Sequence, residues 1–167
     1  MIEMTLAMAE RAVRAAQDKA KALGTPMTVT VVDEAGRLVL SARGDGTSFL
    51  SPETSRAKAT AAANFRASTA ELAERAQKGS VFFSTVAGVL PGQVLPSHGG
   101  MPIMAKGKVI GGIGCGGGTG EQDHECAIAG ANVINAWQTA TIATLLCVKR
   151  SNTRSTIFLN KSWRGAA

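Results

Sequence analysis

The 167-residue sequence contains no tyrosine, and aromatic residues make up only 4% of it. Proteins that bind single-stranded nucleic acid stack bases on aromatic side chains, so this class of function has little support. Cysteine is also scarce, with Cys115, Cys126 and Cys147 as the only examples. Their odd number and the lack of a close CxxC spacing argue against a disulfide framework and a zinc knuckle.

Long uncharged apolar runs are missing as well. No stretch approaches the roughly 20 residues that a membrane-crossing helix needs. Residues 1–23 carry charged side chains throughout, whereas a signal peptide needs an apolar run. We therefore expect no membrane association and no export, and we expect a cytoplasmic protein.

Charge is unevenly distributed along the chain, whose net charge is +6. Residues 1–136 are nearly neutral, whereas residues 137–167 contain five basic residues and no acidic one. Such a tail can contact phosphates without specificity, but the chain lacks the other features of a specific nucleic-acid binder. We predict one domain over residues 1–136, followed by a basic C-terminal tail over residues 137–167 whose structure the sequence does not indicate.

Apolar periodicity and capping signals predict the helices. Serine or threonine followed by glutamate or glutamine three residues later forms a capping box at residues 68–71 and again at residues 119–122. Proline directly after Ser51 marks another helix start. The helices expected from these signals cover residues 2–23, 51–65, 68–78 and 121–137.

Alternating or continuous apolar runs predict the strands. The segments with such runs are residues 27–32, 38–41, 81–89, 101–105 and 108–113. Lys106-Gly107 offers good chemistry for a two-residue hairpin turn, although lysine is not the best first residue there. Because hairpins dominate and no βαβ alternation appears, we expect an α+β fold with an antiparallel sheet and helices packed on it.

Residues 112–117 match the letters GxGxxG, the dinucleotide-binding pattern. They lie late in the chain and outside a βαβ unit, and no acidic residue follows about 20 positions later, so we reject dinucleotide binding. The glycines permit sharp turns and close approach of a neighbour. That neighbour is either a ligand or a packed helix.

The chain has two histidines, His98 and His124, which are the side chains best suited to proton transfer near neutral pH or to metal ligation. His98 lies in a loop, where functional groups are common. For His124, a solvated helix start is the simpler explanation. Lys58, Arg43 and Asp45 offer charges that suit a carboxylate ligand, but surface solvation is the usual fate of such side chains.

Six ordered blocks together resemble the GlcG/HbpS family, which is also called haem-degrading-like or PduO C-terminal-like. The blocks are VVDEAGRL at 31–38, RGDG at 43–46, SRAKATAA at 55–62, GGMPI at 99–103, VIGGIG at 109–114 and QDHECA at 122–127. Each block is weak alone, but their order is specific. The resemblance covers residues 2–136 and excludes the tail.

The resemblance implies a profilin-like antiparallel β-sheet flanked by helices, and self-association into dimers or larger rings. It also implies a cavity near the first hairpin and the glycine-rich loop. Some relatives bind haem, iron or corrinoid-related partners, and others belong to catabolic pathways. The pocket residues that it suggests are Arg43, Asp45, Lys58, Gly99, Gly100, Pro102, Ile103 and Asp123. His98 departs from the family pattern, in which a small residue or proline usually precedes the glycine pair.

Three functions follow as hypotheses. In the first, the chain binds haem or a small metabolite, with His98 as a possible iron ligand, Lys58 and Arg43 on carboxylates, and Asp45 orienting them. The second is a cofactor-free isomerase, lyase or dehydratase that acts on a small carboxylated substrate, with His98 as the acid or base and Lys58 or Arg43 as the carboxylate anchor. The third is an oligomeric scaffold without catalysis. The first two require the Arg43–Asp45 bend, the Lys58 helix and the His98–Ile103 loop to face one hollow.

Overall fold

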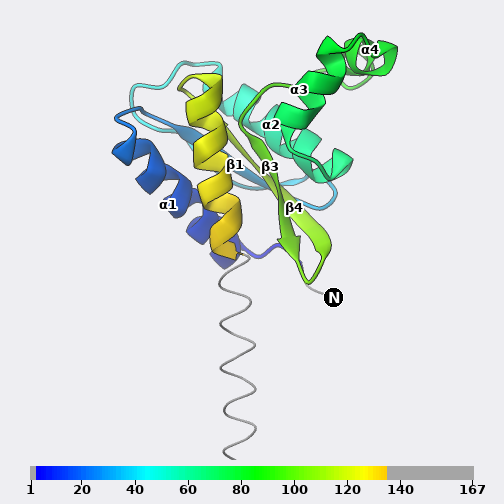
Figure 1. The fold of residues 1–167 in the computed structure, drawn as a ribbon. Coiled ribbons are helices and arrows are strands. Elements are labelled where there is room, and N and C mark those ends of the chain that lie inside the picture. Colours follow the sequence, from blue (N-terminus) through cyan, green and yellow to red (C-terminus); the bar gives the residue numbers. More distant parts are fainter. Residues whose placement is uncertain (1–2, 135–167) are drawn as a thin grey trace, which may run out of the picture. The chain divides into compact units, whose positions relative to one another are not determined.

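The computed structural model describes residues 3–134 (Figure 1). The predicted basic tail, residues 137–167, and the last residues of the predicted C-terminal helix lie outside this range. Among the described helices, none combines the length and the apolar character of a membrane span.

A four-stranded antiparallel sheet forms the centre of the fold, as predicted for an α+β protein. Its strands are β1 (Thr28–Asp33), β2 (Leu38–Ala42), β3 (Gly100–Ala105) and β4 (Lys108–Gly116). Their order is β2-β1-β4-β3. The two predicted hairpins, β1–β2 and β3–β4, are therefore joined through the central pair β1 and β4.

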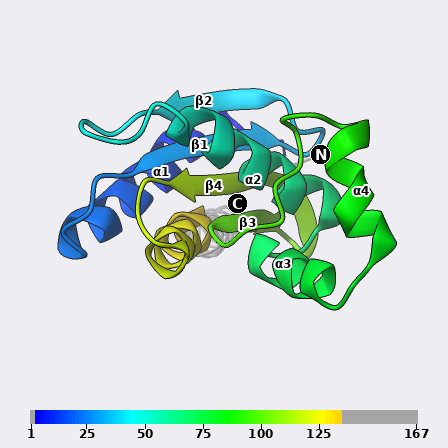
Figure 2. The same cartoon turned by 90° about the horizontal axis from the view of Figure 1, so that it is seen from above.

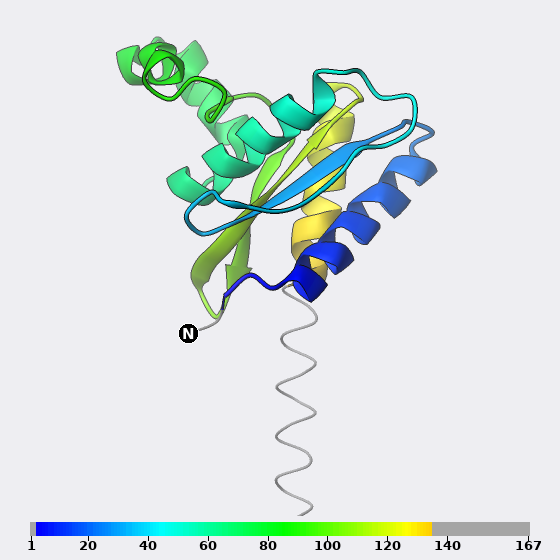
Figure 3. The ribbon, with the colours of Figure 1, turned by 180° about the vertical axis from the view of Figure 1, so that it is seen from behind.

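Helices cover both faces of the sheet (Figures 1 and 3). Helix α2 (Ser51–Phe65) packs on one face. Helix α1 (Leu6–Ala22) and a helix over residues 120–134 lie together on the other, where Gly130 approaches Ile113 of β4 and Ala12 of α1. Three of the four predicted helices begin where the capping signals placed them. In both capping boxes the hydroxyl accepts a backbone N–H, that of Glu71 at Ser68 and that of Gln122 at Thr119.

Helix α2 lies unusually close to β4, because glycine faces it at two alternate positions of the strand. A methyl group at Gly114 would come within 2.0 Å of the Ser55 carbonyl oxygen, and one at Gly112 within 2.2 Å of the Ala59 carbonyl oxygen. The glycine-dense segment is therefore explained by helix packing. Its strand, β4, also continues through Gly116, beyond the predicted end at residue 113.

Buried hydroxyl groups fix the other contact of α2, with β1. The Thr28 hydroxyl lies 2.7 Å from that of Ser51, and the Thr30 hydroxyl lies 2.8 Å from that of Ser55. Each oxygen gains a partner inside the core, which removes the cost of burying it without a hydrogen bond. This seam sets the position of α2 along the sheet, and with it the position of every side chain that α2 carries.

The prediction of a strand over residues 81–89 is wrong, since this segment is helix α4 (Val81–Val89). It follows helix α3 (Thr69–Gln77), and both lie together at one side of the molecule, away from α1 (Figure 2). Phe82 and Phe83 pack with Phe65 of α2, with ring centroids 5.2–6.0 Å apart. An apolar run fits either a strand or a helix, and here the aromatic cluster favours the helix.

Candidate functional site

A buried ion pair joins α2 to the helix over residues 120–134. The Lys58 Nζ atom donates to Asp123 Oδ2 at 2.7 Å and to the Cys115 carbonyl oxygen at 3.0 Å. Both side chains of the pair are only 6% exposed. Lys58 and Asp123, two of the residues suggested by the resemblance, thus contact each other directly at the end of β4.

Each partner of the ion pair also has a second hydrogen bond within the protein. Burial raises the pKa of Asp123, whereas the hydrogen bond and charge of Lys58 and the Gly118 N–H, 3.0 Å from Asp123 Oδ1, oppose this rise. A lysine held this way has its charge neutralised inside the protein. We therefore place Lys58 and Asp123 as a structural pair beneath the surface.

The glycine pair of the predicted loop lies directly over this ion pair. Gly99 has a φ of +110°, and a Cβ there would come within 2.7 Å of the Asp123 Cβ and 3.1 Å of Lys58 Nζ. The Gly99 carbonyl accepts the Cys115 N–H at 2.8 Å, and the Gly100 N–H donates to Thr69 Oγ1 at 2.7 Å. Only glycine fits at position 99, so the Lys58–Asp123 pair and the loop hold each other in place.

The two histidines meet beside this loop. Their ring centroids are 6.0 Å apart, and both residues are partly buried. Within the described residues, the His124 Nδ1 atom is buried and has no hydrogen-bond partner. Burial and the nearby charge of His98 lower the pKa of His124, so its imidazole is neutral at physiological pH. From the sequence, His124 is explained by a solvated helix start, whereas the structure buries its Nδ1 atom. The contact with His98 joins two distant segments and leaves no local signal in the sequence.

The donor set around the histidines consists of these two imidazoles. In the part of the chain that the structure describes, no group of three or more His, Cys, Asp and Glu side chains is arranged to hold a metal ion. A cofactor whose metal already carries most of its own ligands needs only one or two protein donors. The pair His98 and His124 suits that kind of cofactor.

Arg43 and Asp45 lie apart from this group. Both are exposed, and Arg43 Nη2 donates to the Thr47 carbonyl oxygen at 3.0 Å. They line a cavity of about 270 Å³ together with Lys21 of α1 and the start of β1, and its lining includes neither Lys58 nor the loop at His98. The structure thus groups Lys58, Gly99, Gly100 and Asp123 with His98, and places Arg43 and Asp45 elsewhere. The expectation that all three segments face one hollow is not met by this cavity, so a site at His98 has to be argued without Arg43 and Asp45.

The last two suggested pocket residues lie in β3. Pro102 pairs with Gly112 and is partly buried, whereas Ile103 pairs with Gly111 and is fully buried. Ile103 therefore belongs to the core and not to a ligand-facing wall.

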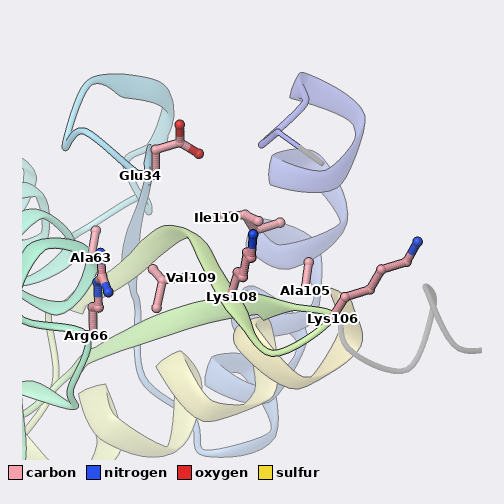
Figure 4. Close-up of a pocket in the computed structure, with 8 residues that line it drawn as sticks. All are labelled: Glu34, Ala63, Arg66, Ala105, Lys106, Lys108, Val109 and Ile110. Atoms are coloured by element: carbon pink, nitrogen blue, oxygen red, sulfur yellow. The ribbon is translucent and has the colours of Figure 1, made fainter. Parts of the chain in front are cut away.

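A larger cavity, of about 600 Å³, lies at the opposite end of the sheet (Figure 4). Arg66, Lys106 and Lys108 supply three cations to its wall, and Glu34 supplies one carboxylate. Sequence analysis did not find it, because its residues come from the end of α2 and from two hairpin turns. The single hint was a lysine at the first position of the Lys106-Gly107 turn.

Comparisons with known proteins identify relatives of the whole domain. The model of the family described as haem degrading protein HbpS-like matches residues 4–132. An uncharacterised 15.0 kDa protein from Citrobacter freundii is 34% identical over 123 residues, which are 72% of this chain and 84% of that protein. The corrinoid adenosyltransferase PduO of Salmonella typhimurium is 32% identical over 73% of this chain, but the chain spans only 36% of that longer protein.

Solved structures that resemble this chain include the same kinds of relatives. A double mutant of HbpS from Streptomyces reticuli is 36% identical, with a TM-score of 0.72 over 80% of this chain and 88% of that chain. The chain of a PduOC complex with haem is 29% identical, with a TM-score of 0.74 over 80% of this chain and 96% of that chain. The fold and the recognised sequence blocks therefore have the same relatives.

Proposed function

Because the chain belongs to the HbpS-like family, we propose that it binds haem and that His98 is an axial ligand of the iron. The observation that carries this proposal is the partly buried His98 imidazole beside the unpartnered Nδ1 atom of His124. The similarity to a protein crystallised with haem supports it. A place in a catabolic pathway, which the resemblance suggests, is part of the same proposal.

The residues around His98 fit an axial ligand. Haem, when bound, would supply an iron that accepts an imidazole nitrogen as a ligand, and His98 would provide it. His98 packs against Gly120 at the start of the helix over residues 120–134; a Cβ there would lie 3.3 Å from the His98 Cβ and 3.4 Å from its Nδ1. The neighbouring His124 stays neutral and thus adds no second positive charge beside the metal.

Other residues of the chain hold this imidazole in place. The loop that carries His98 is fixed through Gly99 and Gly100 to Cys115 and Thr69, and it covers the Lys58–Asp123 pair. We therefore assign Lys58 and Asp123 a positioning role in place of direct contact with a haem carboxylate. Arg43 and Asp45 line a separate cavity, and we do not assign them to the haem site.

Haemin titration tests this proposal. We expect the full chain to give a Soret band with a defined stoichiometry, and His98→Ala to weaken haemin binding about tenfold or more. Arg66→Gly, at the opposite end of the sheet, is the matched control and should bind haemin normally. Unchanged affinity in His98→Ala would remove His98 from the site, and loss of binding in both variants would indicate a general defect instead.

Proton transfer is the second candidate, favoured by the neutral imidazole of His124 next to His98. In that case the chain acts without a cofactor on a small carboxylated substrate, and His98 is the acid or base. A thermal-shift screen separates the two. Stabilisation by small carboxylic acids and not by haemin, lost in His98→Gln, would support this candidate and contradict the first.

We also propose that the chain self-associates, as the family resemblance implies. Large apolar side chains are exposed on α4, namely Val81, Phe82 and Val89, and Phe49 before α2 is 81% exposed. Such residues in groups favour contact with another protein surface. Light scattering after size-exclusion chromatography gives the oligomeric state, and a purely monomeric chain would contradict the proposal and the scaffold hypothesis.

A further inference from the structure

We propose that the cavity between the two hairpin turns and the end of α2 binds an organic anion, with a carboxylate or phosphate head on an apolar body. This cavity is distinct from the histidine site, because the two histidines lie beside the loop at the opposite end of β3 and β4. It has a volume of about 600 Å³, which is within the range of small-molecule sites.

The charges of the cavity favour an anion. Three cations and one carboxylate line it, and none of the four takes part in an ion pair described within residues 3–134. Some basic side chains elsewhere on the surface do have acidic partners: Lys19 pairs with Glu125, and Arg75 pairs with Glu71. Arg66 and Lys108 thus present positive charge to the cavity without forming an ion pair with its one carboxylate, Glu34.

The wall between the charges is apolar. Ala63 of α2 and Val109 and Ile110 of β4 line it. In Figure 4, Lys106 points away from the other labelled residues, so Lys106 lies at the rim. A head group held by Arg66 and Lys108 therefore has an apolar surface beside it for the rest of the ligand, which a simple inorganic ion does not use.

Backbone conformation supplies an independent observation. Among the described non-glycine residues, those with positive φ are Arg66 at 53° and Lys106 at 48°, and both line this cavity. At these positions glycine or asparagine is the favourable choice, since Arg66 follows the end of α2 and Lys106 begins a two-residue hairpin turn. The chain instead places a cation at both. Residues held in this conformation concentrate at ligand sites.

The helix dipole explains at most one of the two cations with positive φ. A cation beside the C-terminus of α2 interacts favourably with the helix dipole, but Lys106 lies on a hairpin and gains nothing from that effect. An anionic ligand explains a cation at both positions, with Arg66 on the head group and Lys106 at the rim of the cavity.

Calorimetric titration of the full chain with phenyl phosphate, phthalate, inorganic phosphate and benzyl alcohol tests the proposal. We expect one of the two aromatic anions to bind, and inorganic phosphate and benzyl alcohol to bind at least about tenfold more weakly, because each lacks half of the required chemistry. Preference for phenyl phosphate indicates a phosphate head, and preference for phthalate a carboxylate head. Failure of both aromatic anions to bind, or equal binding of benzyl alcohol, would overturn the proposal.

Two substitutions then locate the site without straining the fold. Arg66→Gly and Lys108→Gln together should weaken binding of the preferred anion about tenfold or more, while the melting temperature is kept because glycine suits position 66. Arg56→Ala, which removes an exposed arginine from the same helix, is the control and should bind normally. Amide shifts in NMR spectra should fall on residues 63–66 and 105–110. Shifts confined to residues 97–100, or full affinity in the double variant, would refute the site.

Discussion

The two ends of the sheet treat charge in opposite ways. At the end of β4, Lys58 and Asp123 are buried, paired and covered by Gly99, which leaves no room for a side chain. At the hairpin end, Arg66 and Lys108 line an open cavity in which three cations outnumber one carboxylate, and Arg66 and Lys106 have a conformation that glycine prefers. A buried pair is costly to break and serves the fold, whereas unpaired cations around an apolar wall contribute little to stability and suit a ligand.

The largest effect should come from breaking the buried pair. Lys58→Met leaves the Asp123 carboxylate in the core without its counter-charge, and we expect a loss of about 3–5 kcal/mol in the free energy of unfolding. Urea denaturation monitored by circular dichroism measures it. The double variant Lys58→Met/Asp123→Leu should recover much of the loss. A single variant that loses less than about 1 kcal/mol would show that the pair is not the structural element of this end.

Glycine-to-alanine substitutions at the two ends sharpen the contrast. Gly99 and Gly107 both have positive φ, but a Cβ at Gly99 meets Asp123 and Cys115, whereas nothing lies within 4 Å of one at Gly107. We expect Gly99→Ala to cost about 2–3 kcal/mol, from backbone strain and overlap together, and Gly107→Ala about 1 kcal/mol, from strain alone. Thermal unfolding of both variants gives the comparison. Equal losses would contradict the close packing over the ion pair.

Acid should weaken the histidine end specifically. The pKa of His124 is lowered in the folded state, so the unfolded chain takes up a proton first as the pH falls through the ordinary histidine value of 6.5. Stability from neutral His124 is therefore present above that value and lost as the pH falls towards the lowered pKa.

Melting temperatures at about pH 7.5 and about pH 5.5, on either side of the histidine pKa, measure this loss. The decrease in melting temperature between the two pH values should be smaller in His124→Phe. The raised pKa of Asp123 acts with the opposite sign as the pH falls towards the ordinary value of 3.8, since the folded state then takes up the proton first. A loss between the two pH values that is the same in His124→Phe would rule out His124 as its source.

The smallest effect, a gain, is expected at the open end. Arg66→Gly relieves the positive φ at the end of α2, and we expect about 0.5–1 kcal/mol of added stability. The loss of a favourable cation at the helix C-terminus offsets part of the gain. Chemical denaturation with Arg56→Ala as the control measures the difference. A clear decrease in stability would mean that Arg66 supports the fold and is not held there for a ligand.

Much of the fold follows from local signals in the sequence. Both hairpins, the helices over 51–65 and 68–78, and the capping box at Ser68 are predicted from alternation, turn residues and hydroxyl caps. These signals depend only on residues that are close together in the chain, and they say nothing about packing between distant segments. The strand expected at 81–89 is wrong because valine and phenylalanine fit both structures, and the packing of Phe82 and Phe83 on Phe65 decides for the helix.

The candidate site was predicted only in part, because it depends on contacts between segments that are distant in the sequence. The blocks of the resemblance include Lys58, Gly99 and Asp123, which lie together in the structure, but they do not reveal that the charges of Lys58 and Asp123 neutralise each other. The contact between His98 and His124, and the separation of Arg43 from both, depend on how α2 and the helix over residues 120–134 cross the sheet. No spacing in the sequence contains that information.

The contact of α2 with β4 restricts how this sequence can change. The backbones of α2 and β4 are in contact at Gly112 and Gly114, so there is no space between helix and strand for a larger side chain. Any residue bigger than glycine there must push the whole helix outward, and with it both the lysine at its middle and the arginine at its end. A substitution at Gly112 or Gly114 is therefore tolerated only if residues of α2 change with it; otherwise both positions must remain glycine.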